Sequence, residues 1–212
     1  MPYLKIRLDS ILCEKDRFYR TLLVKKDLEL YSFGIAIAQS FRALLYHTFT
    51  FESKKTSYYP PFFDENDGID KSMDDYKVKD LDNEFKYCYD LGECWEFNGK
   101  IDKKEINEIY LDEFNEEKEV VLIDGAGQGI WEDNKDTLVK YFNGEIDPNR
   151  IRNSSIKGIY KPINFKIKKF GDFDTAFNLK KEKKEFYKLY LYAKSKIFEG
   201  TNKEYYQINA EI

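Results

Sequence analysis

Apolar and charged residues alternate at the start of the chain. Leu4, Ile6 and Leu8 recur with the period of two that places one apolar row on a single face of a half-buried strand. A second segment rich in β-forming residues follows at 18–24, after a polar turn region. We therefore expect the chain to begin with two strands that pair antiparallel.

The apolar period changes to three and four in the next segment. One stripe consists of Leu30, Phe33, Ile37, Phe41 and Leu44. This spacing predicts a helix over residues 30–44 that turns one face to the core. Glycine destabilises a helix interior by up to ~1 kcal/mol relative to alanine, so Gly34 indicates close packing against a neighbouring element.

The middle of the chain contains a predicted hairpin. Residues 47–51 predict a third strand, whereas residues 52–81 contain two prolines and many acidic residues, which predicts a long and largely exposed loop. Aromatic residues then alternate on both sides of the sequence Asp-Leu-Gly-Glu. This pattern predicts two strands joined by a tight turn in which Gly92 takes a positive φ.

The last third of the chain predicts one more strand and two helices. An apolar run at 120–123 predicts the strand, and Asp133 is expected to cap a helix that ends at Gly144. A Lys-rich helix follows, with the apolar stripe Leu179, Phe186, Tyr190, Ala193 and Ile197. The last fifteen residues match no regular pattern. The whole pattern predicts a single α+β domain over residues 1–212, with a mixed or mainly antiparallel sheet, helices packed on one face and a basic C-terminal helix.

Composition and charge narrow the class of protein. The 212 residues include 17 Tyr, 17 Phe and 2 Trp, enough apolar area for a folded core. Three cysteines without zinc-type spacing favour reduced thiols in a cytoplasm. No apolar run approaches the ~20 residues of a membrane helix, so no membrane contact is expected.

The formal charge of −4 is unevenly divided along the chain. Residues 151–212 hold 14 Lys and Arg against 7 Asp and Glu, and residues 1–150 hold 21 against 32. Three interpretations of the basic part stay open: it binds nucleic acid, it docks on the acidic body of the same chain, or it is a solvated face.

Several motifs resemble ligand sites without completing one. The glycines of VVLIDGAGQG miss the last glycine of a dinucleotide-binding turn, where Ile130 stands, so a Gly-rich connection is the preferred interpretation. One acidic cluster lacks the register of a calcium-binding EF-hand loop and is interpreted as a solvated loop. This cluster comprises Asp64, Glu65, Asp67 and Asp70.

Histidine and cysteine give no complete catalytic or metal set. Cys88 and Cys94 flank the predicted turn and can approach each other, but two thiolates make an incomplete zinc site, so we expect ordinary packing thiols. His47 is the single histidine, and a structural role on a strand at the sheet edge is preferred over a role as general base. No metal and no cofactor is expected.

Two acidic turn segments follow predicted strands and are expected to converge at one sheet edge. This constellation comprises Tyr89, Asp90, Gly92, Trp95, Asp124, Gly125, Glu132 and Asp133. Paired carboxylates beside aromatic side chains can act as acid and base when burial separates their pKa values. The same side chains can cap turns and helices. Binding, catalysis and structural capping therefore stay open for the constellation, and binding is the functional interpretation preferred over catalysis.

Several segments resemble, in order, the plasmid pRiA4b ORF-3-like family, whose members are often passenger proteins of insertion sequences. The most specific segment, FKYCYDLGECWEF, is similar to the family signature Tyr-Asp-Phe-Gly-Asp-x-Trp-Glu-His, which maps onto Tyr89, Asp90, Gly92, Trp95 and Glu96. The segment LIDGAGQGIWEDN resembles the family's Asp-Gly-rich stretch before Pro-Pro-Glu-Asp, which maps onto Asp124, Gly125, Glu132 and Asp133. The resemblance covers residues 3–180, with a family core up to about residue 150 and a basic helical extension over 151–212.

The chain departs from the family pattern at polar positions. Ile130 and Trp131 replace the Pro-Pro pair, Phe97 stands where the signature has His, and a second His near His47 is absent. These departures argue against a histidine-dependent or metal-dependent activity. The resemblance implies a compact α+β domain with helices on one face of its sheet, and it implies no secure biochemical activity.

The leading hypothesis is a non-enzymatic binding or accessory protein of a mobile genetic element (plasmid, insertion sequence or phage). It would recognise an unidentified protein partner through the constellation. One alternative is nucleic-acid binding by the C-terminal helix through Lys180, Lys181, Lys184 and Lys188. Another alternative is a carboxylate-based hydrolase or isomerase in which Asp90, Glu132 or Asp133 is the acid or base.

Overall fold

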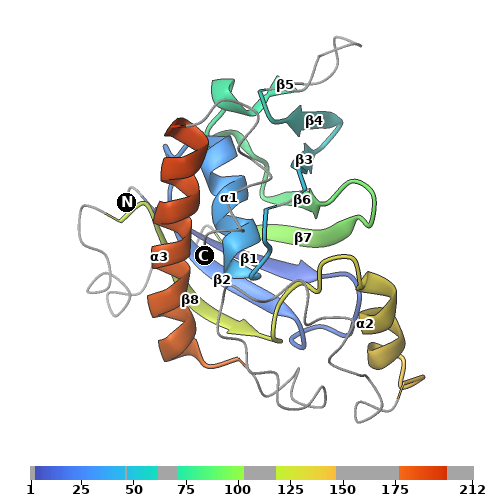
Figure 1. The fold of residues 1–212 in the computed structure, drawn as a ribbon. Helices are drawn as coiled ribbons and strands as arrows, with labels where there is room; N and C mark the ends of the chain where they lie inside the picture. Colours follow the sequence, from blue (N-terminus) through green and yellow to red (C-terminus); the bar gives the residue numbers. More distant parts are fainter. Residues whose placement is uncertain (1–2, 46, 62–70, 103–117, 147–176, 200–212) are drawn as a thin grey trace.

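Eight strands form one mixed sheet in the computed structural model, which describes residues 3–45, 47–61, 71–102, 118–146 and 177–199 (Figure 1). Their order across the sheet is β5-β4-β3-β6-β7-β1-β2-β8. Neighbouring strands are antiparallel except β4 and β5, which are parallel. The strands are β1 (Tyr3–Ser10), β2 (Tyr19–Lys25), β3 (Phe49–Ser53), β4 (Thr56–Tyr59), β5 (Lys71–Ser72), β6 (Glu84–Tyr89), β7 (Trp95–Asp102) and β8 (Val120–Ala126).

Two long helices cover one face of this sheet (Figure 1). Helix α1 (Leu30–Ser40) is buried at every residue, and α3 (Leu179–Glu199) packs against α1 and β8. A short helix, α2 (Lys135–Phe142), follows β8. The predicted α+β class, with a mixed sheet and a C-terminal helix, is therefore confirmed. Among the described residues, no helix is both long and apolar enough to cross a bilayer.

The predicted ribbon and hairpin are confirmed, but the turn conformation differs. Strands β1 and β2 pair antiparallel, and Tyr89 of β6 lies opposite Trp95 of β7. The positive φ values of the hairpin turn belong to Asp90 (59°) and Cys94 (53°) rather than to Gly92. Aspartate tolerates this conformation because its short side chain bonds to nearby backbone groups, as Asp90 does here.

The stretch 52–81 is not the exposed loop that its prolines and acids suggest. It contains β4, β5 and two 3-10 helices, η1 (Met73–Asp75) and η2 (Val78–Asp80). Met73 and Val78 are buried in the core, and the backbone N–H of Val78 donates to the carbonyl of Leu28. The prediction failed because these short elements are stabilised by partners distant in sequence. Residues 62–70, which include Asp64, Glu65, Asp67 and Asp70, lie outside the described residues.

Helix α1 ends four residues earlier than predicted. Arg42 and Leu45 have φ values of 62° and 59°, so the chain leaves the helical path directly after the helix. A Cβ atom on Gly34 would lie 2.0 Å from Cε2 of Phe49, which confirms the predicted close approach. In α3, Phe186, Tyr190 and Ala193 are buried as the apolar stripe predicts. The side chain of Ile197, residues 147–176 and residues 200–212 lie outside the described residues.

Candidate functional site

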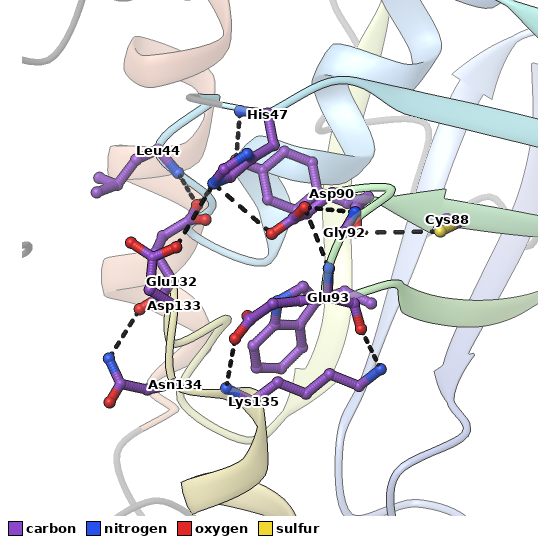
Figure 2. A network of polar contacts seen from close by, with 12 residues as sticks. Leu44, His47, Cys88, Asp90, Gly92, Glu93, Glu132, Asp133, Asn134 and Lys135 are labelled. Atoms are coloured by element: carbon purple, nitrogen blue, oxygen red, sulfur yellow. Dashed lines mark hydrogen bonds and ion pairs between the residues drawn. The ribbon is translucent and has the colours of Figure 1, made fainter.

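Three loops meet at the C-terminal end of α1. They are the turn after this helix, the β6–β7 turn at 90–94, and the segment 127–134 that connects β8 to α2 (Figure 2). Each loop contributes a polar side chain to one cluster, which we call the junction. The junction comprises His47, Tyr89, Asp90, Glu132 and Asp133.

Arg20 fixes the path of the segment 127–134. Its guanidinium is fully buried and donates hydrogen bonds to the carbonyl oxygens of Ser40, Gly127 and Gln128 at 2.7, 2.9 and 3.2 Å. Burial lowers the pKa of Arg20 to about 9, which still leaves it charged at neutral pH. The connection is therefore tied to the end of α1, and Glu132 is carried to the junction.

Glu132 is a fully buried carboxyl group of the junction. Its Oε1 accepts hydrogen bonds from the backbone N–H of Leu44 at 2.7 Å and from the hydroxyl of Tyr89 at 2.9 Å. Its Oε2 is buried and has no hydrogen-bond partner among the described residues. Burial raises the pKa of Glu132 to about 7, an effect that the two hydrogen bonds and His47 only partly oppose. Glu132 is therefore a carboxyl group that titrates near neutral pH.

Asp90 holds the β6–β7 turn and faces His47 with its second oxygen. Its Oδ1 accepts hydrogen bonds from the backbone N–H groups of Gly92 at 2.9 Å and Glu93 at 3.3 Å. Its Oδ2 lies 3.6 Å from Nε2 of His47. The same imidazole nitrogen lies 3.8 Å from Oδ1 of Asp133, whose side chain is 64% exposed. The imidazole thus bridges a buried and an exposed carboxylate (Figure 2).

A lysine clamps the hairpin turn to the start of α2. Nζ of Lys135 donates to the carbonyl oxygens of Glu93 and Cys94, both at 2.5 Å, and its backbone N–H donates to Oε1 of Glu93 at 3.3 Å. The other carboxylate oxygen of Glu93 accepts from the indole N–H of Trp95 at 3.0 Å. Two segments that lie 42 residues apart in sequence are therefore held against each other.

The structure brings part of the predicted constellation together. Tyr89, Asp90, Glu132 and Asp133 share the junction, and Gly92 lies in the adjoining turn. Trp95 is fully buried, and so it serves the core rather than a surface.

Asp124 and Gly125 lie elsewhere. They pair with Thr21 and Arg20 on β2, and β7, β1 and β2 separate β8 from β6. At roughly 4.8 Å per strand, this separation is about 19 Å. The hydroxyl of Tyr19, not a member of the junction, donates to Asp124. The expected convergence with the hairpin turn therefore holds for Glu132 and Asp133, but not for Asp124 and Gly125.

Two other residues, His47 and Asp133, do not lie where the sequence pattern predicts. His47 lies in a bend two residues before β3 instead of on the strand, and this position turns its ring into the junction. Asp133 does not cap α2: the N-cap position is Asn134, and Asp133 has a φ of 56°. The local sequence around His47 and Asp133 does not predict that these side chains meet, because their contact depends on how two distant loops come together. Cys88 and Cys94, in contrast, approach as expected, with 3.0 Å between their Sγ atoms.

Comparison with known proteins agrees with this architecture. The structure is similar to the crystal structure of the protein of unknown function MM3350 from Methanosarcina mazei Go1, with a TM-score of 0.53 and 17% identity over 68% of this chain and 80% of that one. At this identity the likeness shows the fold alone. No curated protein matches the chain significantly. The family model described as plasmid pRiA4b ORF-3-like protein matches residues 2–170. The chain therefore belongs to the plasmid pRiA4b ORF-3-like family.

Proposed function

We propose that the chain is a non-enzymatic accessory protein of a mobile genetic element and that it recognises a protein partner at the rim of the junction. The observation that carries this proposal is the clamp of Lys135 on Glu93 and Cys94, which holds the hairpin turn and the start of α2 as one surface. A surface whose parts are fixed before binding loses less conformational entropy when a partner docks.

The rim combines one exposed apolar side chain with one exposed carboxylate. Leu91 at the tip of the turn is 45% exposed, and the carboxylate of Asp133 is largely exposed beside His47. An apolar contact on the same rim as an exposed carboxylate favours a partner segment that is apolar and basic. The family name points to plasmid-borne genes, which supports the origin in a mobile element.

Affinity capture with matched variants tests this proposal. The double variant Leu91→Ser and Asp133→Asn should lose a host protein that the wild-type chain enriches, by at least about tenfold in quantitative mass spectrometry. The control is Leu191→Ser on α3, because Leu191 is also an exposed leucine (46%) but lies on another element. Capture of the same proteins by all three chains contradicts the proposal.

A second candidate is the carboxylate-based hydrolase or isomerase, which the burial of Asp90 and Glu132 supports. Both are buried, and a carboxyl group with a pKa of about 7 can donate and accept protons at neutral pH. A panel of chromogenic carboxylate and phosphate esters tests it. Turnover that follows a group titrating near pH 7 and disappears in Glu132→Gln supports catalysis. Turnover that is unchanged in this variant, or no turnover of any ester, contradicts it.

A further inference from the structure

We infer that the junction binds a divalent transition-metal cation through His47, Asp90 and Glu132. One ligand atom from each of these three side chains lies within 4.8 Å of the other two. Metal bonds of about 2.0–2.2 Å place neighbouring ligand atoms about 3–3.5 Å apart. The 3.6 Å between His47 Nε2 and Asp90 Oδ2 is already close to this spacing. A small movement of side chains therefore closes the group around one ion.

The unpartnered oxygen of Glu132 is the independent observation that points to a ligand. Glu132 has no exposed surface, and its Oε2 makes no hydrogen bond to any residue in the part of the chain that the structure describes. A buried acceptor without a partner is costly, and a carboxylate without a countercharge is more costly still. A cation at the junction satisfies this oxygen and neutralises the two buried carboxylates together.

The surrounding hydrogen bonds orient these carboxylates as they would orient metal ligands. Oε1 of Glu132 is held by Tyr89 and by the backbone of Leu44, and Oδ1 of Asp90 is held by two backbone N–H groups of its own turn. In each carboxylate one oxygen is fixed and the other is left for the ion, which is the arrangement that hydrogen-bonding partners give to the ligands of metal sites.

The donor set selects the kind of cation. One imidazole and two carboxylates suit Mn²⁺, Fe²⁺ or Zn²⁺ better than Ca²⁺ or Mg²⁺, which prefer oxygen alone. The imidazole binds through its neutral form, with the proton on Nδ1 and the lone pair on Nε2. Asp133 lies on the exposed side of the imidazole, where it can supply a fourth oxygen. This inference goes beyond partner recognition and does not depend on it, because metal binding needs no partner.

The single histidine of the chain gives the test a specific reporter. We would titrate Mn²⁺ into the tag-free, chelator-treated full chain and follow the imidazole protons of His47 by NMR. The expected result is paramagnetic loss of these signals below one equivalent of Mn²⁺. Electron paramagnetic resonance should report one bound ion per chain. Imidazole signals that persist at saturating Mn²⁺ would overturn the inference.

Variants separate this site from other ways of holding a metal. Glu132→Gln and His47→Gln should each weaken Mn²⁺ binding at least about tenfold, and the partly exposed His47 makes the second variant the safer one for folding. Asp124→Asn, an exposed carboxylate on β8, and Cys88→Ser, which removes the thiol pair, should leave the affinity unchanged. Binding that survives both junction variants would place the ion elsewhere and contradict the inference.

Discussion

Glu132 shows how one residue acquires an unusual property from its position. The sequence selects Glu132 through its place after the Asp-Gly segment, but it does not indicate that this glutamate is buried. The turn after α1 and the hydroxyl of Tyr89 enclose it, and burial raises its pKa from the usual 4.5 to about 7. In the metal-free chain the folded state therefore holds a proton that the unfolded state releases between these two pH values.

This linkage predicts a pH-dependent difference in stability. The favourable contribution of the protonated Glu132 is complete below about pH 4.5 and is lost as pH rises through about 7. The free energy of unfolding of the wild-type chain should therefore fall relative to that of Glu132→Gln, by on the order of 3 kcal/mol between pH 4.5 and 8. Urea unfolding in the presence of a chelator measures both. As a control, the variant Glu14→Gln, which changes an exposed glutamate, should show the same pH dependence of unfolding as the wild type. A difference in the free energy of unfolding between the wild type and Glu132→Gln that does not vary with pH would refute the linkage.

At the scale of elements, α1 and β3 pack closely because α1 has a glycine, Gly34, where the two elements meet. Gly34 brings the helix backbone onto the ring of Phe49, and the carbonyl of Gly34 accepts a hydrogen bond from the hydroxyl of Tyr87 at 3.0 Å. The helical propensity that alanine would add is ~1 kcal/mol, less than the typical cost of overpacking a core.

Gly34→Ala should therefore destabilise the protein by up to about 2 kcal/mol, which is the overpacking cost of about 1–3 kcal/mol less the gain in helical propensity. Urea unfolding followed by circular dichroism gives this value. Shortening the facing ring relieves the overlap, so the double variant Gly34→Ala and Phe49→Leu should be less destabilised than the sum of the two single variants. Additive or stabilising effects would show that the close approach of Gly34 and Phe49 does not limit the packing of α1.

Helix α3 presents lysines on its outer side, while Phe186, Tyr190 and Ala193 of its apolar stripe are buried. The four predicted lysines are exposed and make no ion pair with other described residues; they are Lys180, Lys181, Lys184 and Lys188. The lysines that the nucleic-acid alternative requires are therefore exposed on α3.

Salt dependence tests this surface. Binding of duplex DNA in a mobility-shift assay should weaken steeply with salt, and changing the four lysines of α3 to Gln should flatten the slope of log K against log salt by about 3–4. The control changes four exposed lysines outside α3 to Gln, so that its net charge equals that of the α3 variant; they are Lys15, Lys26, Lys55 and Lys71. Absence of binding at low salt, or an equal effect of both variants, rules out recognition by α3.

Elements with their own periodic signal could be predicted, and elements without one could not. The alternation in β1 and the aromatic residues on both sides of the β6–β7 turn identify these strands without any tertiary information. Strands β4 and β5 span four and two residues, and each depends on a neighbour for its hydrogen bonds. No pattern of period two develops over so few residues.

At the scale of the whole molecule, strand order decided which predicted site residues could meet. The Asp-Gly segment and the hairpin both follow strands, yet three strands lie between β8 and β6. Sequence does not reveal this order, so the sequence pattern alone groups Asp124 with Asp90. Glu132 reaches the junction because the chain after β8 turns back along the end of α1, where Ile130 N–H donates to the carbonyl of Phe41.

A buried ion pair joins α3, which lies beyond the residues matched by the family model, to the core. Nε of Arg42 donates to Oε2 of Glu182 at 2.8 Å, and both side chains are almost fully buried. Arg42→Met should lower the free energy of unfolding by about 3 kcal/mol or more, because it leaves a buried carboxylate without its countercharge. Adding Glu182→Leu should recover much of the loss, as measured by urea unfolding. A small effect of Arg42→Met would show that α3 does not depend on this contact.

The claim that three loops close around one cation centre is tested most directly by diffraction. A crystal grown with Mn²⁺ should show one anomalous difference peak at the manganese edge, bonded to Nε2 of His47, to Asp90 and to the buried oxygen of Glu132. A crystal in which the ion lies only at other carboxylates or at the thiols, while these three side chains keep the separations described above, would contradict the account.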